Sequence, residues 1–233
     1  MPVLATIQRI QGEDARQFAY RMIGLSILEL LLRPGEKLSE AELAHSLHMS
    51  RTPVHDVLSR LARENLVDLI PQRGAFVVRI DPVRVEQAAW IQTQAGASML
   101  DTLYAERVPA HAFAVLKENL ARQQLCIATE DYTQATRHVV AFHHSLYELA
   151  NLSLVWHSMQ CASADLHRVF QLCAPQPAHC ESTFFECRCI LDALIARDSA
   201  AACRALCHQF QRISDMLPSL LCAHPEFFIQ PAD

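Results

Sequence analysis

The sequence lacks the short motifs on which several classes of enzyme depend. It has no HExxH pair, no CxxC pair, no glycine-rich phosphate loop and no GxSxG turn that would expose a nucleophilic serine. Only five of its 233 residues are glycine, whereas twelve are histidine and nine are cysteine. We therefore predict that the chain is not an enzyme. A metal- or thiol-dependent enzyme remains the alternative, because the histidines and cysteines are numerous.

Long hydrophobic runs are missing as well. The apolar stretch over residues 24–32 is too short to span a bilayer and contains Glu29. Nothing at the N-terminus resembles a signal peptide, and the odd number of cysteines is atypical of a disulfide framework. These features predict a cytoplasmic protein with no membrane partner and with reduced cysteines.

The chain also lacks a positive net charge, which disfavours nucleic acid as a partner of the chain as a whole. Its formal charge is −5, and this charge is unevenly distributed. Residues 1–80 carry ten Lys and Arg against nine Asp and Glu, a net of +1, and the remaining residues carry ten against sixteen, a net of −6. We call residues 1–80 the head and the remaining residues the body. Because the head is nearly neutral and the body is acidic, we predict that only the head approaches phosphate.

The sequence does contain apolar residues at helical spacing. Half of the residues are hydrophobic and glycine is scarce, which predicts a large and mostly helical core. In the first part of the chain, helices are predicted over residues 15–33, 39–47 and 50–65, with Ser39 capping the second. The segments LVDLI and AFVVRI then alternate around a PQRG turn, as in a β-hairpin. This order of elements predicts a winged helix-turn-helix over residues 1–80.

The rest of the chain contains helical patterns only. A domain boundary is predicted at Asp81-Pro82. Six helices follow, over residues 82–107, 109–128, 131–150, 152–171, 177–196 and 198–222. They predict a bundle over 82–222, with a tail over 223–233. The predicted fold class is therefore mainly α, with a winged helix-turn-helix before an all-α bundle of about six helices.

The stretch SRTPVHDVLSRL, residues 50–61, indicates how the third helix is used. Ser50 is suited to the N-cap, and Pro53 is tolerated in the first turn. Apolar residues at i, i+3, i+4 and i+7 form one buried face: Val54, Val57, Leu58 and Leu61. This leaves Arg51, Thr52 and His55 open near the helix N-terminus. A recognition helix reads base edges from its first turns, and its N–H groups favour phosphate, so the pattern predicts DNA binding.

The segment over residues 34–77 resembles the DNA-binding domain of the GntR family of bacterial transcription regulators: PGEKLSEAELAHSLHMSRTPVHDVLSRLARENLVDLIPQRGAFV. The family's usual central motif is SRTPVREAL followed by RL and a P-x-RGA-x-V wing. By resemblance, the expected contacts with double-stranded operator DNA are Lys37, Arg51, Thr52, Arg60, Arg73 and Gly74. Where the family usually has a second arginine, this chain has His55. We include His55 among the contacts and expect a changed operator preference or affinity, because a neutral imidazole carries no charged fork.

Residues 82–222 resemble the helical C-terminal (FCD) domains of the family's FadR-like branch. AFHHSLYELANLSL is similar to the D-x-x-FH…AGN signature of that branch, and ECRCILDALIARDSAAA to its EH-x-x-IL-x-AI…D…AA signature. Six helices rather than seven is similar to the shorter VanR-like subgroup. The resemblance implies a sequence-specific transcription regulator whose bundle dimerises and binds a small-molecule effector, an organic acid or a related metabolite.

Many relatives hold a divalent metal in this bundle with one Asp and three His. By resemblance those positions become Val139, His143, Cys187 and Gln209 here, so a hydrocarbon, a thiol and an amide replace three of the ligands. We therefore predict effector-pocket residues at these four positions, with no bound metal and no cofactor. A rebuilt soft site for Zn²⁺, formed by His143, Cys187 and His208, stays open.

The first bundle helix departs from the family pattern too. Relatives commonly place an Arg and a Glu, R-x-x-LE, near the effector, and these positions become Thr93 and Ala97. We include Thr93 among the pocket residues. An effector carboxylate would then need another partner, for which the candidates are Arg137, His167, Arg168 and Arg188. The alternative is a regulator with a degenerate pocket that only dimerises.

Overall fold

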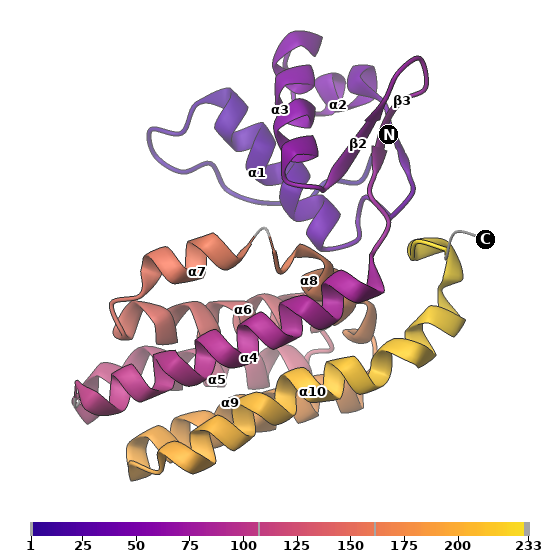
Figure 1. Cartoon of the computed structure of the whole chain (residues 1–233). Coiled ribbons are helices and arrows are strands. Elements are labelled where there is room, and N and C mark those ends of the chain that lie inside the picture. The colour runs from indigo at the N-terminus through magenta and orange to yellow at the C-terminus, as the bar shows by residue number, and fades with distance from the viewer. Residues whose placement is uncertain (1, 107, 161, 231–233) are drawn as a thin grey trace. The chain divides into compact units, whose positions relative to one another are not determined.

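The computed structural model describes residues 2–106, 108–160 and 162–230 (Figure 1). The chain forms two compact units. The first contains the residues up to Pro82 together with the chain from Ser219 onward, and the second runs from Val83 to Pro218. In the described part of the chain, no helix is both long enough and apolar enough to cross a membrane.

The first unit is a winged helix-turn-helix, as predicted. Its helices and strands are α1 (Ala15–Leu28), β1 (Lys37–Leu38), α2 (Glu40–Ser46), α3 (Arg51–Arg63), β2 (Val67–Ile70) and β3 (Gly74–Val77). The strands form an antiparallel sheet in the order β1-β3-β2, in which Lys37 faces Phe76 and Ile70 faces Gly74. The core beneath α3 is aliphatic, and Ile23 and Ile27 of α1 are fully buried in it.

Several details of this unit differ from the sequence-based expectations. The first helix ends at Leu28 rather than at residue 33, because Leu30 adopts a left-handed conformation with φ 61°. Strand β1 was not predicted, since two residues carry too little pattern. Ser39 caps α2 by accepting from the Glu42 N–H, as expected, whereas Ser50 stands at the N-cap of α3 without a side-chain capping bond.

The second unit is a helical bundle. Its elements are α4 (Pro82–Ala105), η1 (Ala110–Phe113), α5 (Ala114–Ala128), α6 (Tyr132–Leu149), α7 (Ser153–Gln160), α8 (Ala164–Cys173), α9 (Pro177–Ala196) and α10 (Ser199–Ala223). Helix α5 lies against both α6 and α9. Helices α4 and α10 approach closely at Gly96, where an added Cβ would lie 2.5 Å from Leu206 Cδ2. The close approach explains why a side chain larger than hydrogen is absent there.

Where about six bundle helices were expected, the described residues form seven, α4 to α10. The segment predicted as one helix over 152–171 is two helices, because α7 ends at Gln160 and α8 begins at Ala164. Ser163, at the start of α8, is buried and accepts a 2.8 Å hydrogen bond from Gln92 of α4. A contact with a distant helix therefore holds the chain at this break, and local periodicity does not reveal it.

The chain beyond α10 belongs to the first unit. The short helix η2 (Pro225–Phe227) is followed by Phe228, which is fully buried and pairs with Ile80 in a parallel bridge. The Ile80 N–H donates to Phe227 O at 2.9 Å, and the Ile229 N–H donates to Ile80 O at 3.0 Å. The predicted tail is thus largely ordered, and only its residues 231–233 lie outside the described residues.

Candidate functional site

Helix α3 presents a polar end to solvent. Its apolar residues are buried as predicted: Val54, Val57, Leu58 and Leu61. Because that face points into the core, Arg51, Thr52 and His55 are exposed in the first two turns. The first N–H groups of a helix have no partner within it, and the Ser50 side chain accepts no capping hydrogen bond from them. The start of α3 therefore combines open backbone donors with an exposed arginine, which suits a phosphate and a base edge.

His55 is paired with an acidic residue of α2. Its Nδ1 lies 2.9 Å from Glu40 Oε1, and the imidazole side chain is 57% exposed. This hydrogen bond and the charge of Glu40 raise the pKa of His55 above its usual value. In the protonated ring, Nδ1–H donates to Glu40 while the Nε2–H is available to another acceptor. His55 is therefore a pH-dependent donor on the exposed side of α3.

The tip of the wing gathers two cations around one aromatic ring. Lys37 Nζ lies 6.0 Å from the centroid of Phe76, and Arg73 Cζ lies 5.8 Å from it. Both cations are exposed. Gly74 has φ 102°, a conformation that L side chains rarely adopt, so the turn requires glycine. The wing thus holds Lys37, Arg73 and Gly74 close together, and their role as DNA contacts stays a prediction.

Arg60 has a different environment from the other predicted DNA contacts. Its guanidinium lies 3.7 Å from the centroid of Tyr20, and its Nε donates to Glu64 Oε1 at 3.4 Å. The Tyr20 hydroxyl donates to the other oxygen of Glu64 at 2.5 Å. Arg60 nevertheless keeps half of its side chain exposed, at 51%. It therefore links α1 to α3 and still faces solvent.

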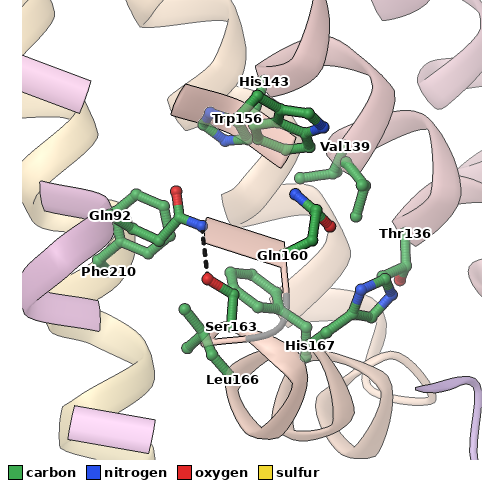
Figure 2. Close-up of a pocket in the computed structure, with 12 residues that line it drawn as sticks. Gln92, Thr136, Val139, His143, Trp156, Gln160, Ser163, Leu166, His167 and Phe210 are labelled. Atoms are coloured by element: carbon green, nitrogen blue, oxygen red, sulfur yellow. Dashed lines mark hydrogen bonds between the residues drawn. The ribbon is translucent and has the colours of Figure 1, made fainter. Parts of the chain in front are cut away.

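The second candidate site is a cavity inside the bundle (Figure 2). Its volume is about 60 Å³, and its lining comes from α4, α6, α7, α8 and α10. The lining residues are Gln92, Thr136, Val139, Val140, His143, Trp156, Gln160, Ser163, Leu166, His167, Phe170 and Phe210. Figure 2 shows these side chains converging on one space, with Gln92 bonded to Ser163. The cavity is therefore mostly apolar, with amide, hydroxyl and imidazole groups at its edge.

The structure brings together the four positions at which the family resemblance implies a metal. His143 Nε2 lies 2.8 Å from Gln209 Oε1, and Gln209 Nε2 donates to Cys187 Sγ at 3.7 Å. Val139 and His143 line the cavity, whereas Cys187 and Gln209 are fully buried behind it. An amide oxygen only accepts, so His143 donates from Nε2. The amide of Gln209 thus bonds to the imidazole nitrogen and the sulfur that a metal would need as ligands.

These residues do not fit the divalent metal that the family resemblance implies. Burial raises the pKa of the Cys187 thiol to about 12, so the thiolate form is strongly disfavoured. His208, the third member of the alternative soft site, bonds instead to Glu186 Oε1 at 2.9 Å and is 70% exposed. Within the described residues, no group of three His, Cys, Asp or Glu side chains is placed to hold a metal.

Thr93 does not line the cavity. It lies one residue from Gln92, which does, and its hydroxyl donates to Ala89 O within its own helix at 2.8 Å. Sequence reasoning missed Gln92, and it also missed Trp156, Gln160 and Ser163. No local signal marks these residues, because their burial depends on how α7 and α8 fold over the cavity.

Of the four candidate partners for a carboxylate, only His167 lines the cavity. Arg168 is buried and forms an ion pair with Asp165. Asp165 also forms an ion pair with Arg84, whose Nε lies 3.3 Å from Asp165 Oδ2. Arg188 lies over the ring of Phe185, 5.2 Å from its centroid. Arg137 is half-buried on α6 and is not a lining residue. The cavity therefore has no cationic partner among its described lining residues.

Two family descriptions match the chain. The bacterial regulatory proteins of the gntR family match over residues 15–77, and the FCD domain matches over residues 99–212. An HTH-type transcriptional regulator in an unstable DNA locus of Streptomyces ambofaciens is 32% identical over 95% of this chain and 92% of its own length. The chain belongs to the GntR family. It is therefore a transcription regulator with a DNA-binding helix-turn-helix and an FCD effector-binding domain, and the enzyme alternative is not supported.

Other relatives agree with this assignment. The HTH-type transcriptional repressor RspR of Escherichia coli K12 is 26% identical over 93% of this GntR-family chain and 94% of its own length. Among solved structures, E. coli McbR/YncC has a TM-score of 0.78 at 20% identity, covering 89% of this chain and 98% of that one. A GntR regulator from Rhodococcus sp. RHA1 has a TM-score of 0.74 at 20% identity, with coverage of 88% and 97%. These two likenesses show the fold. The VanR-like subgroup stays a prediction.

Proposed function

We propose that α3 of this regulator enters the major groove of its operator with its N-terminal end. The observation that carries the proposal is the exposure of Arg51, Thr52 and His55 on the side of α3 opposite its buried face. A helix that presents its first turns in this way reads base edges, and Arg51 suits guanine O6 and N7. The wing group of Lys37, Arg73 and Gly74 then contacts the neighbouring backbone or groove. Arg60 contacts phosphate from its position against Tyr20.

We further propose that the regulator acts as a homodimer in the cytoplasm. A helix-turn-helix head reads one half-site, and two heads related by two-fold symmetry read a pseudo-palindromic operator. The head is the domain of residues 1–80, and the domain of residues 82–222 dimerises and binds the effector. The genome lies in the cytoplasm of a bacterial cell, so an operator-binding protein acts there. By analogy with RspR, which is named a repressor, bound protein would block transcription until the effector releases it.

The effector site that we propose is the bundle cavity with Val139 and His143 in its wall and Cys187 and Gln209 behind them. An organic acid or a related metabolite is the class that the family resemblance suggests. The second candidate is a regulator that dimerises without an effector, and the small volume of about 60 Å³ favours it. Titration of the full-length protein against DNA flanking its own gene, followed by gel shift, tests operator binding. Release of that DNA by a metabolite would separate the two candidates.

A further inference from the structure

The effector cavity offers only uncharged partners. Its described lining residues include no Lys, Arg, Asp or Glu. The polar groups there are two amides, two hydroxyls and two imidazoles, from Gln92, Thr136, His143, Gln160, Ser163 and His167. The remaining surface is aliphatic or aromatic. A cavity of this composition solvates a dipole well and a net charge poorly.

The two imidazoles of the cavity are held in the neutral form. Burial lowers the pKa of His143 to about 4, although its bond to Gln209 opposes the shift. Burial also lowers the pKa of His167 to about 4. Neither ring therefore supplies a positive charge near neutral pH. Each ring instead offers one donor and one acceptor, and the donor of His143 is already used by Gln209.

Two arginines of the bundle, Arg168 and Arg212, are committed to other groups. Arg168 is fully buried against Asp165, so turning it toward the cavity would break a buried ion pair. Arg212 donates to both carboxylate oxygens of Glu186, at 2.9 and 2.7 Å, and to Thr183 at 2.8 Å. A carboxylate in the cavity would therefore lose water without gaining a counter-charge.

One polar atom of the cavity wall is buried and unsatisfied. His167 Nε2 has no hydrogen-bond partner among the described residues. Leaving a buried imidazole nitrogen without a partner is costly, and the cost falls when a ligand dipole bonds to it. Trp156, Phe170 and Phe210 supply aromatic faces to the same space. The arrangement calls for a ligand with one hydrogen-bonding group on an otherwise apolar body.

Resting on the proposed function, we infer that the effector is a small uncharged molecule of largely apolar character with a hydrogen-bonding group for His167, rather than a carboxylate. The cavity of about 60 Å³ is small, and a second cavity of about 10 Å³ shares Thr136, Val139 and Phe170 with it. A ligand larger than a few non-hydrogen atoms therefore binds only if lining side chains move. Amides and carboxylates of matched shape and increasing size are therefore suitable test ligands.

The test uses three isosteric pairs on the full-length protein without DNA: acetamide and acetate, propionamide and propionate, and benzamide and benzoate. The chain has two tryptophans, of which Trp90 is 66% exposed and Trp156 lines the cavity. Trp90→Phe therefore makes Trp156 fluorescence a local reporter of binding. In at least one pair the amide should bind with a Kd roughly tenfold lower than its carboxylate.

Two variants assign the binding to His167. His167→Leu should raise the Kd of the amide several-fold, whereas His111→Leu, at an exposed position, should leave that Kd unchanged. A carboxylate that binds as tightly as its amide would overturn the uncharged class and would leave the effector-responsive regulator standing. Failure of all three amides to change Trp156 fluorescence would also overturn it. Operator binding is measured separately, so its failure would count against the proposed function alone.

Discussion

His143 of α6 and Gln209 of α10 are joined by a 2.8 Å hydrogen bond between Nε2 and Oε1. The bond fixes the tautomer of the imidazole, because the amide oxygen can only accept. The other end of the amide donates to Cys187 Sγ. The three side chains form a neutral chain of hydrogen bonds at positions where relatives in the family are expected to hold a metal. This explains how the bundle tolerates these substitutions without an uncompensated buried charge.

Removal of the amide should destabilise the bundle. Gln209→Ala leaves the Nε2–H of His143 and the thiol of Cys187 without their partner in a fully buried site. The expected loss is about 1–3 kcal/mol in the free energy of unfolding. Urea denaturation followed by circular dichroism measures it. Gln211→Ala on the exposed side of the same helix is the matched control and should cost much less. Equal losses for the two variants would contradict the role of the bond.

Restoring the family ligands should create a metal site. The substitutions Val139→Asp, Cys187→His and Gln209→His, made together, place a carboxylate and two imidazoles around His143. The purified triple variant should hold about one zinc ion per chain by elemental analysis, and the wild type should not. Adding His143→Ala should remove the metal. A folded triple variant with no more zinc than the wild type would show that the four positions do not converge as described.

Operator binding should depend on pH through His55. Glu40 raises the pKa of His55, so the ring stays protonated up to a pH above the ordinary value of 6.5 and loses its charge as the pH rises further. In the proposed complex the protonated ring faces phosphate or a purine, so affinity for a defined operator should fall as the pH rises through the raised pKa of His55. Fluorescence anisotropy at fixed salt measures the profile between pH 6 and pH 8, roughly the range in which histidine titrates.

Two substitutions separate the contributions of His55 and Glu40. His55→Gln should remove this pH dependence. Glu40→Gln should move its midpoint down toward 6.5 and raise the affinity, since a carboxylate beside the DNA-facing surface is lost. The same shift acts on folding, because the stability from the pair is present below pH 6.5 and is lost as the pH rises through the raised pKa. An unchanged profile in His55→Gln would exclude this histidine as the sensor.

The segment after α10 should contribute to the stability of the DNA-binding unit. Phe228 is fully buried, and Phe227 and Ile229 beside it exchange backbone hydrogen bonds with Ile80. Phe228→Ala should lower the free energy of unfolding of this unit by about 3–5 kcal/mol. Ile229→Ala is the control, because Ile229 is 45% exposed. Hydrogen exchange at the β2 and β3 amides reports this unit specifically. Unchanged protection in Phe228→Ala would mean that the segment is dispensable.

The sequence allowed the prediction of features that depend on local pattern. The recognition helix is one, because the spacing of Val54, Val57, Leu58 and Leu61 defines its buried face within three turns. The wing is another, since its two longer strands alternate around one turn. Strand β1 was missed because its two residues gain their partner only from β3, almost forty residues later.

The remaining features depend on contacts between distant parts of the chain. The break between α7 and α8 depends on Ser163 meeting Gln92, 71 residues away. Docking of Phe228 beside Ile80 joins the C-terminal segment to the residues that follow the wing. The four positions at which the resemblance implies a metal could be predicted from the family motifs, and the structure brings them together. Their hydrogen bonds could not be predicted, since they depend on side-chain orientation inside the bundle.

The central claim is that α3 reads the operator from its N-terminal end. Arg51 and Arg63 are both exposed, at the first and last residues of the helix, and form a matched pair. Fluorescence anisotropy with a defined operator should show that Arg51→Ala weakens binding by about 1–3 kcal/mol per half-site, whereas Arg63→Ala has little effect. Affinity within about twofold of the wild type for Arg51→Ala, or an equal loss for Arg63→Ala, would contradict the claim.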